Sequence, residues 1–142
     1  MSDAPPTIDL RPATVSDIDK VYEFIKPFVA TEELLPRSEV ELALLFQNGF
    51  VAARGDEIVG CAAVEIYSVK MAELQCLAVS PDCRGLGIGR KLVTACVQRA
   101  RDKGVLELMA ITASERLFQD CGFDYSLPNQ KRALFIQTGN RK

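Results

Sequence analysis

Three alternating glycines constrain this chain more than any other feature of its sequence. Gly85, Gly87 and Gly89 stand between a predicted strand, residues 71–79, and a long predicted helix, residues 88–103. Glycine allows a sharp turn and lets a ligand reach the backbone without meeting a Cβ atom. The first amides of a helix have no partner within it and lie at the positive end of its dipole. The junction therefore predicts an anion site, above all for a pyrophosphate.

The residues around these glycines distinguish several kinds of glycine-rich loop. Arg84 and Arg90 can add charged side chains to bound phosphates. A nucleotide P-loop ends in Gly-Lys-Ser/Thr, whereas Gly89 is followed by Arg-Lys-Leu. A Rossmann fingerprint has two residues between its last two glycines, and here only Ile88 separates them. A turn that merely joins two elements is the remaining alternative to a phosphate site.

Composition excludes several functional classes. The 142 residues contain no histidine, which rules out a histidine-based triad and most zinc sites. Five cysteines without metal-type spacing indicate a reducing compartment. The net charge of −2 disfavours a nucleic-acid partner, and no apolar stretch is long enough to span a membrane. We expect one cytoplasmic domain over residues 1–142, frayed at 1–6 and 139–142, with no metal.

Apolar periodicity and turn residues predict an α+β domain. Apolar side chains recur every four residues along 88–103, which gathers them on one helix face. Ser80-Pro81 ends the strand before it, because a residue that precedes proline is held extended. Further strands are predicted at 7–11, 50–53, 58–67, 105–112, 123–125 and 133–137, and further helices at 16–28, 38–47 and 114–120.

The sequence Arg-Gly-Leu-Gly-Ile-Gly at 84–89 resembles the Arg/Gln-x-x-Gly-x-Gly/Ala acetyl-CoA motif of the GNAT acetyltransferases. The similarity continues in order through Leu-Arg-Pro-Ala at 10–13, Leu-Ala-Val-Ser-Pro at 77–81 and Phe-Gln-Asp-Cys-Gly-Phe at 118–123, and covers roughly residues 8–137. This resemblance implies an α/β/α layered GNAT fold. We expect a mixed, mostly antiparallel sheet of about six or seven strands, with about four helices.

A narrower resemblance is to the acetyltransferase domain of the N-acetylglutamate synthases and their short stand-alone relatives. It is carried by Leu-Pro-Arg-Ser at 35–38, Ala-Glu-Leu-Gln-Cys-Leu-Ala-Val at 72–79 and Leu-Pro at 127–128. Two-domain members of that group also carry an amino-acid kinase domain. We expect neither that domain here nor regulation by arginine through it.

The resemblance also implies how acetyl-CoA, the expected co-substrate, is bound. Pantetheine would lie in a gap between strands 71–79 and 105–112 and pair with backbone groups near Leu77 and Val79. The Leu77 amide would polarise the thioester carbonyl and stabilise the oxyanion. The acetyl group would pass directly to an amine in a ternary complex. The pyrophosphate would be held by Arg84, Gly85, Leu86, Gly87, Ile88, Gly89 and Arg90.

The reaction needs a base, because only an unprotonated amine attacks the thioester. Glu73 is the candidate, acting directly or through a water. Strand alternation puts Glu73, Gln75 and Leu77 on one side of the sheet if no bulge intervenes. A solvated charge at a sheet edge is the alternative interpretation of Glu73. Cys76 is predicted to be structural, since no histidine can activate its thiol.

The group that protonates the leaving thiolate is less defined. Leu117-Phe118 stands where many members of the superfamily carry a tyrosine for this purpose. Ser114 matches a serine near the sulfur in the synthase-like relatives, and it is equally well explained as a helix N-cap. Water is a further route, and Tyr67 and Tyr125 are alternative acids whose positions the sequence does not predict.

Arg37 is the predicted binder of a substrate carboxylate, in a bidentate pair. A surface arginine at the foot of a helix is the alternative. The synthases carry polar and basic substrate contacts near their closing strand, whereas residues 134–138 read Leu-Phe-Ile-Gln-Thr. Lys131 and Arg132 are possible substitutes. Glutamate is therefore one candidate among small amines.

Three functions remain open at this point. The first is acetylation of the primary amine of a small metabolite, and the second is acetylation of a protein lysine or N-terminus. The third is a non-catalytic acyl-CoA-binding module, which the missing tyrosine favours and Glu73 disfavours. We expect no nucleic-acid or membrane partner, and either a monomer or a homodimer.

Overall fold

The computed structural model describes residues 7–125 and 134–139. The ends that the sequence predicts to be frayed lie outside these residues, apart from Gly139, which is exposed. Leu127-Pro128, Lys131 and Arg132 also lie outside them. The elements follow the order β1 (Ile8–Pro12), α1 (Ile18–Ala30), α2 (Glu39–Leu45), β2 (Gly49–Arg54), β3 (Glu57–Ile66), β4 (Met71–Val79), α3 (Ile88–Asp102), β5 (Glu107–Ala110) and α4 (Glu115–Asp120).

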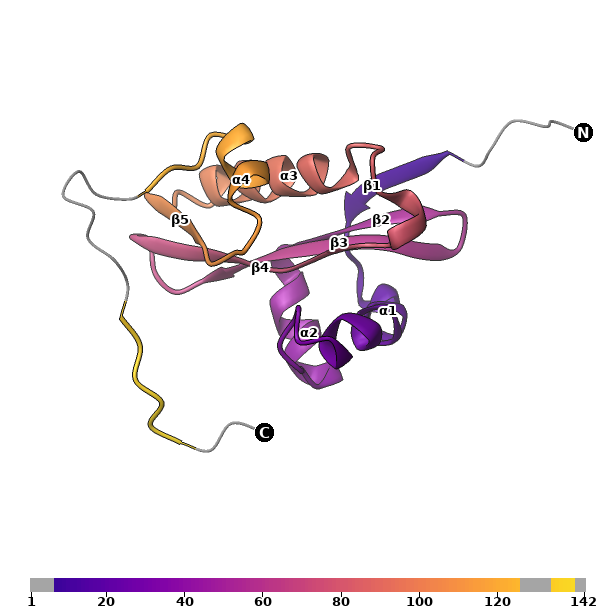
Figure 1. Ribbon diagram of the computed structural model, residues 1–142, viewed down its shortest axis with the longest axis horizontal. Coiled ribbons are helices and arrows are strands. Elements are labelled where there is room, and N and C mark those ends of the chain that lie inside the picture. The colour runs from indigo at the N-terminus through magenta and orange to yellow at the C-terminus, as the bar shows by residue number, and fades with distance from the viewer. Residues whose placement is uncertain (1–6, 126–133, 140–142) are drawn as a thin grey trace, which may run out of the picture.

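The sheet has the strand order β1-β2-β3-β4-β5. Neighbouring strands are antiparallel as far as β4, and β5 then runs parallel to β4. In Figure 1, α1 and α2 cover one face of the sheet, and α3 and α4 cover the other. The expected layered α+β fold with a mixed, mostly antiparallel sheet is thus confirmed. The described residues form five strands, fewer than the six or seven expected.

The difference in strand number arises after α4. Residues 123–125 were expected to form a strand, but the Phe123 amide donates to the Phe118 carbonyl at 3.0 Å and so caps α4. The two rings also pack edge to face, 5.1 Å apart. Residues 134–137 pair with no strand in the described chain, and Leu134 to Ile136 are between 72% and 93% exposed. A strand needs partners for its backbone groups, and neither segment has them.

Two hydrophobic clusters hold the layers together. One joins α1 and α2 to the sheet and includes Val21, Ile25 and Leu42. The other joins α3 to the opposite face and includes Leu92 and Cys96, as the four-residue repeat predicts. Burial of a large aliphatic side chain stabilises a fold by roughly 1.5–3 kcal/mol. The sheet is therefore packed on both faces, with a separate hydrophobic cluster on each.

An ion pair between a half-exposed arginine and a buried aspartate links β1 to the start of α1. The Asp17 carboxylate is 5% exposed and accepts bonds of 2.7 and 2.8 Å from the Arg11 guanidinium. It also accepts from the Thr14 amide at 2.7 Å. The Arg11 bonds, followed by those from Thr14, hold the pKa of Asp17 well below its usual range. The chain entering the α1–α2 layer is anchored through this pair.

Candidate active site

Strand β4 contains a bulge at its centre. Ala63 of β3 stands opposite Gln75, whereas Cys61 stands opposite Ala78, so β4 has one extra residue between these pairs. Cys76 adopts the left-handed conformation with φ of 60°. For a residue with a side chain this conformation costs roughly 1–2 kcal/mol. The buried surroundings of Cys76 must offset that cost.

The bulge reverses the direction of the side chains along β4. Before it, Leu74 packs into the α3 cluster, so Glu73 and Gln75 are directed to the α1–α2 face. After it, Cys76 joins the α1–α2 cluster and Leu77 packs against the α3 cluster. The expectation that Glu73, Gln75 and Leu77 share one side is therefore wrong for Leu77. A cysteine with positive φ gives no signal in the sequence that would have revealed the bulge.

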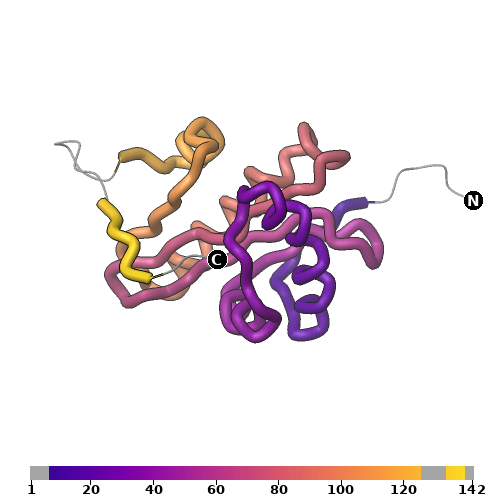
Figure 2. The backbone as a smooth tube through the Cα atoms, turned by 60° about the horizontal axis from the view of Figure 1, so that its bottom comes forward, coloured from indigo at the N-terminus to yellow at the C-terminus, as the bar shows by residue number. Residues whose placement is uncertain are grey.

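Strands β4 and β5 pair over only part of their length. The two strands pair only from Met71 to Leu74, opposite Glu107 to Ala110. Residues 75–79 have no β5 partner, and the chain after Ala110 leaves the sheet toward α4. Figure 2 shows β5 and α4, in orange, apart from the violet α1–α2 pair. Among the described residues, Leu77 and Val79 thus have no paired strand on this side of β4, as the expected gap requires, and this unpaired stretch is called the β4–β5 opening below.

The glycine-rich segment forms the entry to α3. Gly85 and Gly87 have φ of 84° and 78°, a region that favours glycine, and Gly87 is the N-cap residue. The first helical bond runs from the Lys91 amide to the Gly87 carbonyl at 3.1 Å. The amides of Ile88, Gly89 and Arg90 precede that bond and have no partner within the helix. This geometry is the one that binds phosphate oxygens.

The two predicted phosphate-binding arginines differ in their surroundings. Arg84 is exposed and forms no ion pair with the described residues. Arg90 contacts the Asp120 carboxylate at 3.3 Å and so links α3 to α4. Both partners are largely exposed, so this pair contributes little to stability. Leu86 is exposed beside Arg84, whereas the Ile88 side chain lies in the core.

A chain of hydrogen bonds crosses the α1–α2 face. The Arg37 guanidinium donates to Gln75 Oε1 at 2.7 Å. The Gln75 amide group donates to Glu73 Oε1 at 3.0 Å and to the Tyr67 hydroxyl at 3.1 Å. The Tyr67 hydroxyl donates to the same Glu73 oxygen at 2.7 Å. The predicted base and the predicted carboxylate binder are therefore joined through one glutamine.

Two groups of this network have hydrogen-bonding capacity left for a ligand. The hydrogen-bond partners of Arg37 are neutral, Gln75 and the Leu35 carbonyl, and it forms no ion pair with a carboxylate of the described residues. Both donors to Glu73 meet Oε1, and no hydrogen bond from the described chain reaches Oε2. The face thus offers a cation and a carboxylate oxygen to one small molecule.

Tyr67 is one of the alternative thiolate acids, and its position was not predicted from the sequence. The turn after β3 brings it back over β4, where its amide donates to the Met71 carbonyl at 3.1 Å. Partial burial, followed by the bond to Glu73, raises the pKa of Tyr67 to about 12. The phenol therefore keeps its proton at neutral pH and remains a donor to Glu73.

Ser114 and Cys76 differ in how well the structure explains them. Ser114 is at the N-cap position of α4, but its hydroxyl makes no capping bond. Its amide instead donates to Thr112 Oγ1 at 2.8 Å. Cys76 is 5% exposed, and its carbonyl accepts from the Cys61 thiol at 3.3 Å. Ordinary capping thus does not account for Ser114, whereas packing accounts for Cys76.

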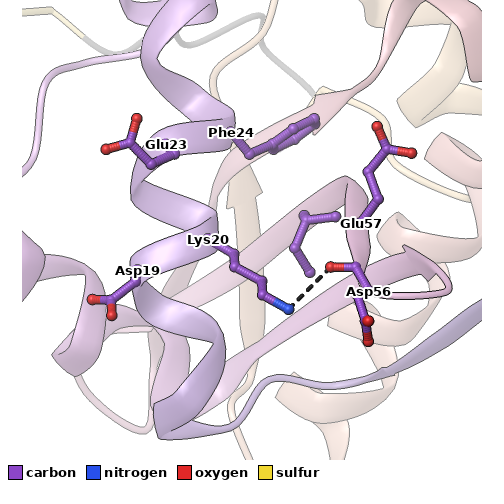
Figure 3. A pocket seen from close by; sticks show the side chains of 7 residues that line it. Asp19, Lys20, Glu23, Phe24, Asp56 and Glu57 are labelled. Atoms are coloured by element: carbon purple, nitrogen blue, oxygen red, sulfur yellow. Dashed lines mark hydrogen bonds between the residues drawn. The ribbon is translucent and has the colours of Figure 1, made fainter.

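Two surface hollows lie beside these elements. The larger, about 490 Å³, is between α1 and the β2–β3 turn (Figure 3), away from the glycines and from Glu73. In it Lys20 donates to the Asp56 carbonyl at 3.0 Å. The smaller, about 310 Å³, borders the glycine-rich loop and is lined by Ile8, Leu10, Ala52, Leu86, Ile88 and Lys91. Size alone therefore does not identify the functional site.

The described residues contain no group of three histidine, cysteine or acidic side chains arranged to hold a metal ion. Within 7–125 and 134–139, no helix combines the length and the apolar character needed to cross a bilayer.

Comparison with known proteins identifies the family. Residues 17–123 match the acetyltransferase (GNAT) family. This chain belongs to the GNAT acetyltransferases. Members are acyltransferase enzymes that use acetyl-CoA as co-substrate.

Three similar proteins indicate the branch of the family. The amino-acid acetyltransferase of Pasteurella multocida is 36% identical over 129 residues, which cover 87% of this chain and 29% of that protein. This chain thus spans less than a third of the curated relative's length. Rv2747 from Mycobacterium tuberculosis, solved with CoA, is 28% identical with a TM-score of 0.75, covering 84% of this chain and 73% of that one. N-acetylglutamate synthase from Neisseria gonorrhoeae, solved with CoA and N-acetyl-glutamate, is 25% identical with a TM-score of 0.76, covering 90% and 31%.

Proposed function

We propose that this GNAT domain transfers the acetyl group of acetyl-CoA to the primary amine of a small metabolite that carries a carboxylate, with an amino acid such as glutamate as the leading candidate. The observation that carries the proposal is the hydrogen-bonded chain from Arg37 through Gln75 to Glu73. It offers a carboxylate binder and a proton acceptor on one face, next to the opening in the sheet.

The distance between Arg37 and Glu73 supports an acceptor of amino-acid size. Two hydrogen bonds of 2.7 and 3.0 Å flank a single carboxamide group. Given ordinary C=O and C–N bond lengths, the guanidinium nitrogen and the Glu73 oxygen are within about 9 Å of each other. An α-amino acid that hydrogen-bonds Arg37 with its carboxylate can therefore bring its amine to the Glu73 carboxylate.

The proposed reaction is a direct transfer. Glu73 accepts a proton from the substrate ammonium, and the free amine attacks the thioester carbonyl carbon through the β4–β5 opening. The Leu77 amide stabilises the oxyanion, and the C–S bond breaks as the carbonyl re-forms. The attacking nitrogen loses its second proton, which passes to the leaving CoA thiolate through water or Ser114, so that the amide and the free thiol are formed. Glu73 then returns the first proton to solvent. Cys76, buried and without a histidine partner, forms no acyl-enzyme.

The α3 face supports the other half of the proposal. The unpartnered amides of Ile88, Gly89 and Arg90 would hold the CoA pyrophosphate, with Gly85, Leu86 and Gly87 leaving the approach open and Arg84 adding charge. Backbone groups of Leu77 and Val79 would pair with the pantetheine arm along the unpaired edge of β4. We include in the proposal a single acetyltransferase domain acting in the cytoplasm.

The test is a thiol-release assay with acetyl-CoA and a panel of amines. Free amino acids are compared with their α-amides and decarboxylated amines, and with lysine-containing peptides. We expect turnover above background hydrolysis, with a free carboxylate raising kcat/KM at least about tenfold, the worth of one charge-assisted hydrogen bond. Preference for the peptides would favour a protein acetyltransferase. CoA binding without turnover on any amine would favour a non-catalytic acyl-CoA module.

A further inference from the structure

We infer, on the basis of the proposed function, that Tyr67 and Gln75 are positioning residues that hold the Glu73 carboxylate by Oε1 and leave Oε2 to accept the substrate proton. Neither residue belongs to the glycine motif. Tyr67 reaches Glu73 through the β3–β4 turn, and Gln75 reaches it as the next residue on the same face of β4.

The geometry around Glu73 explains why positioning is needed. Glu73 is half-buried on β4, and a glutamate side chain loses about 1.5–2 kcal/mol of rotamer entropy when it is fixed. Two donors at 2.7 and 3.0 Å converge on its Oε1, and they also contact each other at 3.1 Å. These three hydrogen bonds fix the Glu73 carboxylate before a substrate arrives. The rotamer entropy of the side chain is therefore lost on folding and not during the reaction.

Tyr67 is suited to this role because it donates but does not titrate in the working range. Tyr67 is 55% exposed, and partial desolvation, followed by the Glu73 bond, raises its pKa to about 12. The other charged groups near Glu73 are Glu65, directly opposite on β3, and Arg37, reached through Gln75. On the β5 side its partner is the uncharged Met109. Tyr67 and Gln75 thus supply the direct hydrogen bonds that counter the like charge of Glu65.

Gln75 has a second effect, because its two ends serve different groups. Its oxygen accepts from Arg37 while its nitrogen donates to Glu73 and Tyr67. The orientation of the carboxylate binder and that of the base are therefore set by one side chain. A change at Gln75 alters both acceptor binding and proton transfer, whereas a change at Tyr67 alters only proton transfer.

The decisive experiment measures pH–rate profiles for Tyr67→Phe and Gln75→Leu, using the best acceptor of the amine panel. Removing a donor destabilises the charged carboxylate. In both variants the midpoint of the acid limb should therefore move up by about half to one pH unit, and kcat should fall about tenfold. The acceptor KM should stay near the wild-type value in Tyr67→Phe and rise in Gln75→Leu. Tyr22→Phe is the matched control, since no hydrogen bond of its hydroxyl occurs within the described residues.

A double-mutant cycle distinguishes positioning from a general structural effect. In a Glu73→Gln background, Tyr67→Phe should cause no further loss of kcat, because the group that it positions has been removed. An unmoved acid limb, or multiplicative losses in the double variant, would overturn the inference even if Glu73 is the base. Full activity of Glu73→Gln alone would exclude Glu73 as the base and the inference with it, whereas absence of turnover on every carboxylate-bearing amine would overturn the proposed function. Thermal unfolding of each variant checks that the fold is intact.

Discussion

On the α3 face of the sheet the proposed ligand-binding groups are backbone amides, whereas on the α1–α2 face they are side chains. The first set is fixed by the geometry of a helix start and by two glycines with positive φ. The second set is fixed by a hydrogen-bonded network among Arg37, Gln75, Glu73 and Tyr67. Backbone groups recognise a feature common to all CoA thioesters. Side chains select among acceptors, and a single substitution can change them.

Glu73→Gln is the strongest test of this difference between the two faces, because it has the largest expected effect. The substituted side chain keeps its shape but cannot accept the ammonium proton, so turnover should fall roughly 10- to 1000-fold. Calorimetry should show CoA affinity unchanged, because the phosphate-binding amides are on the other face. Glu65→Gln, opposite Glu73 on β3, is the control and should retain most of the activity. Equal rates in the two variants would exclude Glu73 from the mechanism.

Gly87→Val tests the backbone side. Valine in a left-handed conformation is strained by roughly 1–2 kcal/mol, and its branches enter the phosphate path, so CoA affinity should fall at least about tenfold. Gly55→Val is a matched control: Gly55 also has positive φ, 63°, and open space around its Cβ position, but it is in the β2–β3 turn. Both variants should lose stability on heating, and only Gly87→Val should lose CoA in a calorimetric titration.

Arg37→Ala has the smallest expected effect and tests whether Arg37 binds the carboxylate of the acceptor. Loss of a charge-assisted bond should raise the KM of carboxylate-bearing acceptors about tenfold and leave CoA affinity unchanged. Amines without a carboxylate should be acetylated at the same rate by both proteins. Arg101→Ala, at the exposed end of α3, serves as the control. If all amines slowed equally, Arg37 would be structural and not a carboxylate binder.

The backbone half of the site could be predicted from sequence because its determinants are local. Three glycines between a strand and a helix specify the conformation of 84–89 without reference to the rest of the chain. The layered fold could be predicted for the same reason, since helix and strand periodicities are properties of short segments. The Arg90–Asp120 contact could not, because it depends on where α4 packs.

For the side-chain half of the candidate site, the sequence identified Arg37 and Glu73 as candidates but did not predict how the side chains are arranged. Alternation along a strand predicts one side for Glu73 and Leu77, but the positive φ of Cys76 reverses it. Tyr67 reaches Glu73 across the β3–β4 turn, and no spacing rule gives that contact. The closing strands were wrong because strand propensity does not supply a pairing partner, and the Phe123 amide was needed to cap α4.

The bulge at Cys76 makes acceptor choice separable from thioester handling. Because one additional residue turns the strand over, side chains at 73 and 75 can be exchanged without presenting any new group to the Leu77 side. A library that varies Gln75 together with Arg37 should therefore retarget the enzyme toward other amines while its use of acyl-CoA stays constant. If Cys76 followed regular strand alternation instead, each side chain after it would project to the opposite layer, and Leu77 would share a face with Glu73 and Gln75.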